Sequence, residues 1–462
     1  MKILLVNPAY HGWFYLFGVR IPPLGLAYLA SSFRERGGEV DILDLAVARP
    51  EEIPSFEDYD LVGIGTDTTR FKTAMELAER AKKAGRTVVM GGPHPTVVDD
   101  APFQRDAVDY VVRGEGEATL VELAEALSRG RSVEDVPGLT YRRRGRIHRT
   151  PARPFREDLD ALPGPARDLL PMDRYRSAKI GTWPLTPVIT SRGCPFRCTF
   201  CASSHMNGPK WRPRSAESVV DEIEEVQKRW GYPAVAFSDD NSTLDPARTD
   251  RICDLILARN IDVKIWLFCR VDTALRHPET VAKMAKAGVT SAFIGIETLN
   301  PVHLKSVNKG FSPDATPKAV DLFRAHGIDV LGSYIIGYPD ETLADIRYTV
   351  RRAREIRTST AQFTILTPYP GTVLFDQVKD RITSWNWAHY DGYHAVFQPR
   401  KMSRFALQMM LVYAHLGFYA RSKASLQGFA KFTWRRKRDL SAVGKVFKDM
   451  FMAPPLPGGK HA

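Results

Sequence analysis

Cysteine is scarce in this chain, and long apolar runs are missing from it. Only five cysteines occur among 462 residues and none precedes Cys194, which excludes a disulfide-stapled small domain and indicates a reducing compartment. No stretch approaches the roughly 20 apolar residues that a membrane span needs. The N-terminal run MKILLVNPAY is typical of a buried strand and has no signal-peptide cleavage pattern. We therefore expect a cytoplasmic protein.

Acidic residues are scarce at the end of the chain. From Arg400 onward there are thirteen Lys and Arg but only two Asp, so this segment carries nearly all of the net charge of +12. Aromatic residues from Phe418 to Phe451 are interleaved with these charges. The pattern is typical of a cationic helix that contacts an anionic membrane surface from the cytoplasmic side, and it also fits a helical cap whose charges are merely solvated.

The first 137 residues alternate strand-like and helical patterns. The strand-like runs are at 3–6, 39–45, 61–65, 88–91 and 110–112, and the helical patterns are at 24–36, 71–84 and 118–128. This alternation predicts an α/β domain with a parallel, doubly wound sheet of the flavodoxin or Rossmann kind. Such sheets bind ligands in the loops beyond the carboxyl ends of their strands, here at 7–8, 66–70, 91–96 and 113–117.

Three further segments follow this domain. Residues 138–183 are rich in Arg, Pro and Asp with little periodicity and are predicted to be a linker. Residues 184–398 contain six β/α units, which predict a partial (β/α)6 barrel with its chemistry at the carboxyl ends of the strands. Residues 399–462 are predicted to form a basic helical region.

Three cysteines lie within eight residues directly after the first barrel strand, as Cys194, Cys198 and Cys201 in a C-x3-C-x2-C run. Three thiolates leave one iron of an iron-sulfur cluster open to bind a substrate, whereas a structural zinc site normally takes a fourth ligand, such as the nearby His205. Cys253 and Cys269 fall in a helix and a strand and are interpreted as buried structural thiols.

The cysteine loop, with Phe200 just before its last cysteine and a partial barrel after it, resembles the radical S-adenosylmethionine (radical SAM) superfamily. The motifs FSDDN at 237–241, GIET at 295–298, IIGYPDET at 335–342 and TPYPGT at 367–372 extend the resemblance over the barrel. It implies that the cysteine triad binds a 4Fe-4S cluster and that Phe200 lies against the adenine of S-adenosylmethionine.

Two further S-adenosylmethionine contacts are implied by the same resemblance. Ser238 and Asp239 stand where many members have a Gly-Gly-Glu motif that contacts the methionine amino group, and Glu297 would lie near the ribose. The residues by themselves also allow plainer interpretations. Asp239 and Asp240 fit a solvated pair at a helix N-terminus, and Glu297 fits an ordinary buried ion pair.

The first domain is similar to the cobalamin-binding domain found ahead of this barrel in B12-dependent members. The similarity is carried by GGPHPT at 91–96 and RGEGE at 113–117. It implies cobalamin contacts from the four loops, at Pro8, Thr66, Arg70, Gly91, Gly92, His94, Arg113 and Glu115.

The chain contains no D-x-H-x-x-G motif, by which many B12 domains supply a histidine to cobalt. Histidine ligation is therefore not expected, and His94, which lies between two prolines, is interpreted as a structural or corrin-edge residue. Loop 66–70 is expected at the lower corrin face. Arg70 either disfavours a lower axial ligand there or is a plain surface arginine.

The resemblance implies a cobalamin-dependent methyltransferase that uses S-adenosylmethionine both as a methyl source and as the source of a 5′-deoxyadenosyl radical. An electron donor such as flavodoxin or ferredoxin is implied as a partner. TPYPGT and the following segment 390–403 are similar to members that act on large apolar molecules, such as tetrapyrroles and hopanoids. A lipophilic or natural-product substrate with an unactivated acceptor carbon is therefore expected.

Two other functions stay open from the sequence. One is an oxidative cyclisation or ring rearrangement that uses cobalamin without donating a methyl group. The other is a nucleic-acid-directed protein such as a tRNA methylthiotransferase, suggested by the basic, aromatic-rich end of the chain. Methylthiotransferases have additional N-terminal cysteines, which this chain lacks, so no nucleic-acid partner is expected.

Overall fold

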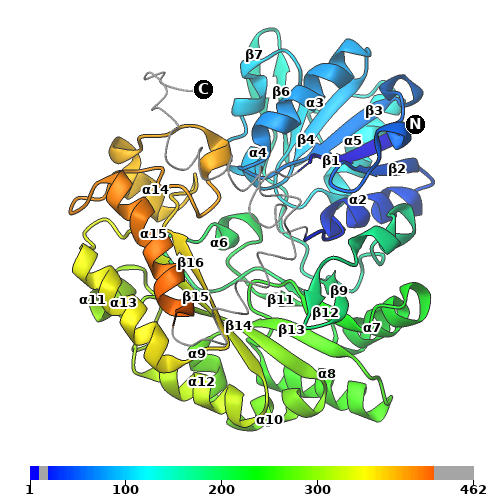
Figure 1. The fold of residues 1–462 in the computed structure, drawn as a ribbon. Helices are drawn as coiled ribbons and strands as arrows, with labels where there is room; N and C mark the ends of the chain where they lie inside the picture. The colour runs from blue at the N-terminus through cyan, green and yellow to red at the C-terminus, as the bar shows by residue number, and fades with distance from the viewer. Residues whose placement is uncertain (10–18, 421–462) are drawn as a thin grey trace. The chain divides into compact units, whose positions relative to one another are not determined.

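The computed structural model describes residues 1–9 and 19–420, which divide into two compact units (Figure 1). Among the described residues, the first unit consists of 1–9, 19–178, 192–194 and 203–214. The second consists of 179–191, 195–202 and 215–420. The basic segment 421–462, which the sequence analysis predicts to be helical, lies outside the described residues.

The first unit is built on a seven-stranded sheet with the strand order β2-β1-β3-β4-β5-β6-β7. Its first five strands pair in parallel: β1 (Lys2–Asn7), β2 (Glu39–Asp44), β3 (Leu61–Gly65), β4 (Thr87–Gly91) and β5 (Tyr110–Val112). β1 is buried along nearly its whole length, as expected for a parallel strand covered on both faces. The predicted doubly wound parallel sheet is confirmed.

Helices cover this sheet at α2 (Leu24–Glu35), α3 (Phe71–Lys83), α4 (Pro93–Val97) and α5 (Glu117–Ser128). Apolar side chains of α2 and α5 form one core with alternate residues of β1, such as Ile3 and Leu5. α3 packs against β3 and β4. Short 3-10 helices lie at Pro50–Glu52, Phe56–Asp58, Ala101–Gln104, Arg167–Leu169 and Met172–Tyr175.

The segment predicted to be a linker contains a β-hairpin. β6 (Leu139–Arg143) pairs antiparallel with β5 and with β7 (Arg146–Arg149), so the first sheet extends beyond residue 137. The hairpin turns at Arg144 and Gly145, both with positive φ (51° and 76°). Such two-residue turns usually contain Asn or Asp before the glycine, so the basic run RRRGR carries a weak hairpin signal.

The second unit is a curved, open sheet with the order β16-β15-β14-β13-β12-β9-β8. Six strands run in parallel: β9 (Trp183–Val188), β12 (Ala234–Phe237), β13 (Lys264–Cys269), β14 (Val289–Glu297), β15 (Asp329–Ile336) and β16 (Thr360–Ile365). β8 (Lys179–Ile180) adds an antiparallel edge. The predicted partial (β/α)6 barrel is confirmed, and two short strands, β10 (Ser191–Arg192) and β11 (Arg212–Pro213), lie outside it.

Helices follow the barrel strands in sequence. They are α6 (Ser203–Met206), α7 (Ala216–Trp230), α8 (Pro246–Ala258), α9 (Val271–Arg276), α10 (Pro278–Lys286), α11 (Pro301–Ser306), α12 (Ala315–Ala325), α13 (Leu343–Ile356), α14 (Val373–Val378) and α15 (Arg404–Tyr419), with 3-10 helices at Lys379–Arg381 and Trp387–His389. Within the described residues, no helix is long and apolar enough to cross a membrane.

Candidate cofactor-binding sites

The loop that carries Cys198 and Cys201 is attached to three other parts of the barrel unit. Thr199 donates its backbone N–H to the Val307 carbonyl (3.3 Å) and accepts from the Leu374 N–H (2.9 Å). Asn308 donates from Nδ2 to the Arg197 carbonyl (3.2 Å). The guanidinium of Arg270 lies 3.6 Å from the centre of the Phe196 ring. Contacts with α11, α14 and the end of β13 thus set the path of the loop.

Cys194 begins the motif and belongs to the first unit. Its backbone N–H donates to the Gly208 carbonyl (3.2 Å). The preceding Gly193 has φ of +85°, and a Cβ at this position would lie 2.2 Å from the Lys210 carbonyl oxygen. Only glycine fits this close approach, so the residue before the first cysteine is fixed by the backbone.

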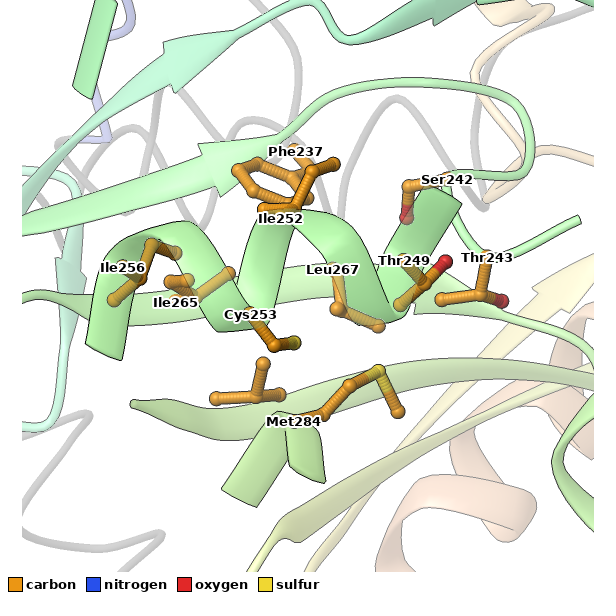
Figure 2. A pocket seen from close by; sticks show the side chains of 11 residues that line it. Phe237, Ser242, Thr243, Thr249, Ile252, Cys253, Ile256, Ile265, Leu267 and Met284 are labelled. Atoms are coloured by element: carbon orange, nitrogen blue, oxygen red, sulfur yellow. The ribbon is translucent and has the colours of Figure 1, made fainter. Parts of the chain in front are cut away.

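The five thiols divide into two kinds. Cys194, Cys198 and Cys201 are partly exposed, whereas Cys253 and Cys269 are buried. Cys253 points into an apolar pocket beside Met284 and Leu267 (Figure 2). Burial raises the pKa of Cys253 to about 12 and that of Cys269 to about 11, so both stay protonated at neutral pH. Cysteine binds metals as the thiolate, so the partly exposed cysteines of the motif suit metal binding better than the two buried thiols.

Across the residues that the structure describes, no three His, Cys, Asp or Glu side chains converge as a metal site. The fit of the triad to an iron-sulfur cluster therefore rests on its donor chemistry: three accessible thiols within eight residues. The side chain of His205, the alternative zinc ligand, is outside the described part of the chain.

Asp239 is buried at the end of β12, whereas its neighbours Ser238 and Asp240 are exposed. Its carboxylate accepts from the Thr190 N–H (2.6 Å), the Thr190 hydroxyl and the Ser191 hydroxyl (2.9 Å). Burial raises the pKa of Asp239, and these hydrogen bonds act in the opposite direction. The side chain connects the ends of two barrel strands, an arrangement different from a solvated helix-terminal pair.

Glu297 ends β14 at a register shift between Gly295 and Glu297, with φ of +64°. Its Oε1 lies 2.5 Å from Lys309 Nζ, and both side chains are nearly buried. A Cβ on Gly295 would lie 2.6 Å from Glu297 Oε1 and 2.8 Å from Lys309 Nζ. The bulge and the glycine therefore make room for this ion pair at the strand end. The interpretation of Glu297 as a member of a buried ion pair is confirmed, with Lys309 as its partner.

Phe200 is partly buried and packs against an apolar cluster that includes Val307, Tyr338 and Leu366. Beside this cluster, Glu341 is fully buried, and its Oε2 accepts from the backbone N–H groups of Gly337 (2.5 Å) and Tyr338 (3.2 Å). Burial raises the pKa of Glu341 to about 8 despite these hydrogen bonds, so the carboxyl is mostly protonated at neutral pH.

In the first unit, Asn7 and Arg70 connect the loops after β1 and β3. Arg70 donates to Asn7 Oδ1 (2.6 Å) and to Asp67 Oδ2 (2.9 Å), while Asn7 donates to Asp44 Oδ1 (2.7 Å). Pro8 follows Asn7 and is partly exposed. Arg70 is therefore held in a network, which differs from the plain surface arginine that the sequence also allowed.

The loops after β3 and β4 approach each other closely. The Thr66 N–H donates to the Gly91 carbonyl (2.9 Å), and Gly92 adopts φ of +103°. A Cβ on Gly92 would lie 2.6 Å from the Thr66 carbonyl oxygen. Glycine is therefore required at position 92, whereas a Cβ on Gly91 would make only an ordinary contact, 3.5 Å from the Val112 carbonyl oxygen.

His94 is buried on the first turn of α4. Its Nδ1 lies 3.2 Å from Thr68 Oγ1, and its ring packs 4.4 Å from the Phe71 ring. Burial lowers the pKa of His94 to about 4, so the imidazole is neutral at pH 7. These contacts agree with a structural role for this histidine and leave its relation to a corrin as a prediction.

Arg113 and Glu115 make structural contacts within the first unit. Arg113 donates to the carbonyl oxygens of Thr150 (2.6 Å) and Leu139 (3.2 Å). Glu115 Oε1 lies 2.8 Å from Arg212 and 3.2 Å from Arg192. Both residues thus connect the loop after β5 to segments that come later in the chain.

Sequence reasoning missed Arg192, two residues before Cys194. Arg192 also pairs with Glu117 (2.6 Å). Burial lowers the pKa of Arg192, but the charges of Glu117 and Glu115 outweigh burial and raise it. The signal was present as an arginine in SRGC and two glutamates in RGEGE, but nothing in the sequence pairs them.

Two family models match this chain. The radical SAM superfamily model matches residues 188–353, and the B12 binding domain model matches residues 16–124. A curated relative, the uncharacterized methyltransferase PH0819 from Pyrococcus horikoshii, is 37% identical over 439 residues, which are 92% of this chain and 94% of the relative.

A second relative is the anaerobic magnesium-protoporphyrin IX monomethyl ester cyclase of Rubrivivax gelatinosus, 28% identical over 98% of this chain and 83% of its own length. Among solved structures, the radical S-adenosylmethionine methyltransferase TsrM from Kitasatospora setae, with cobalamin and a 4Fe-4S cluster bound, superposes with a TM-score of 0.69 at 23% identity. The match covers 82% of this chain and 78% of TsrM, and it supports the two-part fold. The chain therefore belongs to the radical SAM superfamily, in the cobalamin-dependent group that carries a B12-binding domain ahead of the barrel.

Proposed function

We propose that this protein is a cobalamin-dependent radical SAM methyltransferase that methylates an unactivated carbon of a lipophilic substrate. The observation that carries the proposal is the combination of both domains, in this order, with 37% identity to the uncharacterized methyltransferase PH0819 over nearly the full length of each chain. When bound, the cluster and the cobalamin supply the radical and methyl-transfer chemistry that polar amino-acid side chains lack.

The residues of the barrel unit suit a cluster with S-adenosylmethionine. Cys194, Cys198 and Cys201 would hold the 4Fe-4S cluster, because they are accessible thiols in one loop. Phe200 would lie against the adenine, and Glu297, held by Lys309, would lie near the ribose. Asp239 is fully engaged by Thr190 and Ser191, so we assign it to positioning the strand that precedes the cysteine loop. The exposed Ser238 is the better candidate for contacting S-adenosylmethionine.

The four loops of the first unit would bind cobalamin. Pro8, Thr66 and Arg70 come from the loops after β1 and β3, and Arg113 and Glu115 come from the loop after β5. Gly91, Gly92 and His94 supply the loop after β4. This proposal is supported by the direct contacts between these loops, which place their residues at one edge of the sheet. Arg70 would contact the cofactor from a position that its hydrogen bonds to Asp67 and Asn7 fix.

Aromatic residues on the concave face of the barrel sheet support the proposal of an apolar substrate. Ile265 and Leu267 on β13 are buried under the helices, whereas the alternate residues Trp266 and Phe268 are only partly buried. Phe268 packs 4.9 Å from the Phe293 ring of β14, and Trp266 packs 5.9 Å from it. Three partly exposed aromatic rings on the inner face provide a surface for a flat or apolar molecule.

A second candidate function is cyclisation without methyl transfer, because one relative is the ester cyclase of Rubrivivax gelatinosus. The test is anaerobic turnover of the reconstituted enzyme with S-adenosylmethionine, a reductant and a panel of tetrapyrrole and polycyclic substrates, followed by mass spectrometry. Methyl transfer predicts 5′-deoxyadenosine together with a product heavier by one methyl group in place of one hydrogen. Cyclisation predicts a product lacking that gain, and turnover without 5′-deoxyadenosine contradicts both candidates. The electron donor and the cytoplasmic location stay predictions.

A further inference from the structure

The outward face of α15 is apolar from end to end. Four residues of this helix are exposed, and all four are large apolar or aromatic side chains: Phe405 (65%), Met409 (43%), Tyr413 (43%) and Leu416 (52%). They recur at the spacing of one helical face, and we call them the α15 stripe. By contrast, the exposed residues of α7 are all charged: Glu217, Asp221, Glu225, Lys228 and Arg229. The α15 stripe is therefore unusual for a solvent-facing helix of this barrel.

The opposite face of α15 already has its partners in the barrel. Leu407, Leu411 and Phe418 are buried, and the Tyr419 hydroxyl donates to the Ala361 carbonyl of β16 (2.9 Å). His415 packs edge-on against Phe363 with ring centres 5.6 Å apart. The helix is thus anchored through its inward face, and the α15 stripe is not needed to hold it in place.

Basic side chains lie on the helix that packs beside α15. Gly417 brings α15 so close to α13 that a Cβ would lie 3.2 Å from Val350 Cγ1. The two helices lie side by side on the outside of the barrel sheet (Figure 1). α13 exposes Arg347, Arg351 and Arg354 against the single acid Glu355.

Positive charge continues along the chain at both ends of α15. Lys401 precedes the helix and is exposed. The sequence after Ala420 contains ten Lys and Arg and two Asp. An apolar stripe bordered by cations has the composition of a helix that lies in the interface of an anionic bilayer, where the apolar side chains enter the acyl boundary and the cations meet the headgroups.

We propose that the α15 stripe, together with the exposed arginines of the neighbouring helix α13, docks the enzyme peripherally on the surface of an anionic lipid bilayer. Pairing of two copies through this face would bring the same arginines together, and their like charges oppose such a contact. Anionic headgroups attract them instead. The proposal is independent of the reaction, although a bilayer is also where a lipophilic substrate would be found.

The test is flotation of the full-length protein with vesicles of phosphatidylcholine alone or mixed with phosphatidylglycerol. The stripe variant carries Phe405→Ser, Met409→Ser, Tyr413→Ser and Leu416→Ser. The matched control carries Val302→Ser and Leu257→Ser, which are exposed apolar residues (70% and 42%) on α11 and α8. Circular dichroism and thermal unfolding verify that both variants are folded.

We expect the wild type and the control to float with the anionic vesicles. The stripe variant should bind them at least about tenfold more weakly, since it loses four apolar side chains from the interface. A charge-reversal variant, Arg347→Glu with Arg351→Glu, should lose the preference for phosphatidylglycerol. The preference should also decline with added salt.

Three outcomes would overturn the proposal. One is a wild type that binds neither kind of vesicle. Another is a stripe variant that floats as well as the wild type while Gln substitutions at 435–438 abolish binding, which would assign the membrane contact to the basic segment alone. The third is a stripe that mediates self-association, seen as a wild-type dimer and a monomeric stripe variant by light scattering, with no vesicle binding by the wild type.

Discussion

The Asp239 carboxylate accepts the backbone N–H of Thr190 at 2.6 Å, which connects the end of β12 to the end of β9. β9 is the strand whose continuation leads to the cysteine loop. A buried carboxylate that accepts three hydrogen bonds holds these strand ends in one arrangement. We infer that the path of the chain from β9 into the cysteine loop depends on these hydrogen bonds of Asp239.

Asp239→Ala should lower both stability and cluster loading. The substitution leaves one N–H and two hydroxyl groups without their buried acceptor, and the free energy of unfolding should fall by about 3 kcal/mol. The amount of iron bound per chain after anaerobic reconstitution should also be lower than in the wild type. Denaturant unfolding and an iron assay measure the two effects.

Asp240→Ala is the matched control, because Asp240 is the exposed neighbour of Asp239. It should leave both the unfolding midpoint and the iron content close to wild type. Equal losses in the two variants would show that the hydrogen bonds of Asp239 do not have the positioning role assigned to them.

Gly92→Ala tests the close approach of two loops in the first unit. The new Cβ would meet the Thr66 carbonyl at 2.6 Å, and φ of +103° is strained for any residue with a Cβ. We expect a loss of about 2 kcal/mol in the free energy of unfolding and weaker cobalamin binding. Gly164→Ala is the control, because its new Cβ would have no atom within 4 Å. Denaturant unfolding and corrinoid titration should give wild-type values for this variant. Unchanged cobalamin affinity in Gly92→Ala would show that this loop has no part in binding the cofactor.

Glu341 should make stability depend on pH. Its ordinary pKa of 4.5 applies in the unfolded chain, and burial raises the pKa to about 8 in the folded protein. The folded state therefore binds more protons between these values, and its stability should fall as pH rises from about 5 to 8. Glu341→Gln keeps a neutral side chain of similar shape. Its free energy of unfolding, measured with urea at several pH values in this range, should therefore fall less steeply with pH than that of the wild type. The same pH dependence in both proteins would contradict the assigned protonation.

Asp67→Asn tests whether the Arg70 network serves cobalamin. The neutral amide weakens the hold on Arg70, and cobalamin should bind about tenfold more weakly. Asp168→Asn is the control, because Asp168 forms a comparable 2.7 Å pair with Arg34 in the same unit, away from the four loops. Corrinoid titration followed by absorbance measures both. If the two variants bind cobalamin alike, Arg70 has no part in the site.

Local patterns were enough to predict most of the fold. The apolar runs of β1 and β13 and the helical spacing of α2 and α3 are strong signals, and each predicted strand of both parallel sheets is present. The hairpin of β6 and β7 was missed because its turn at Arg144 and Gly145 lies inside a basic run. Its pairing with β5 is a long-range contact that no local pattern records.

The site was predictable only where a motif carries it. The three motif cysteines are recognisable from spacing, and Gly92 from a glycine-rich loop. Lys309 is twelve residues from Glu297, and Arg192 is far from Glu115, so their ion pairs depend on the tertiary fold. The buried role of Asp239 was also invisible, because Asp after a strand equally suits a solvated helix start.

The central claim is tested most directly by the iron and corrinoid content of the anaerobically reconstituted protein, measured for the wild type, Cys194→Ala and Cys253→Ala. We predict about four irons and one cobalamin per wild-type chain. Cys194→Ala should lose the iron, and Cys253→Ala, which removes a buried protonated thiol, should keep it. Iron retained in Cys194→Ala, or a wild type that binds iron but no cobalamin, would contradict the account.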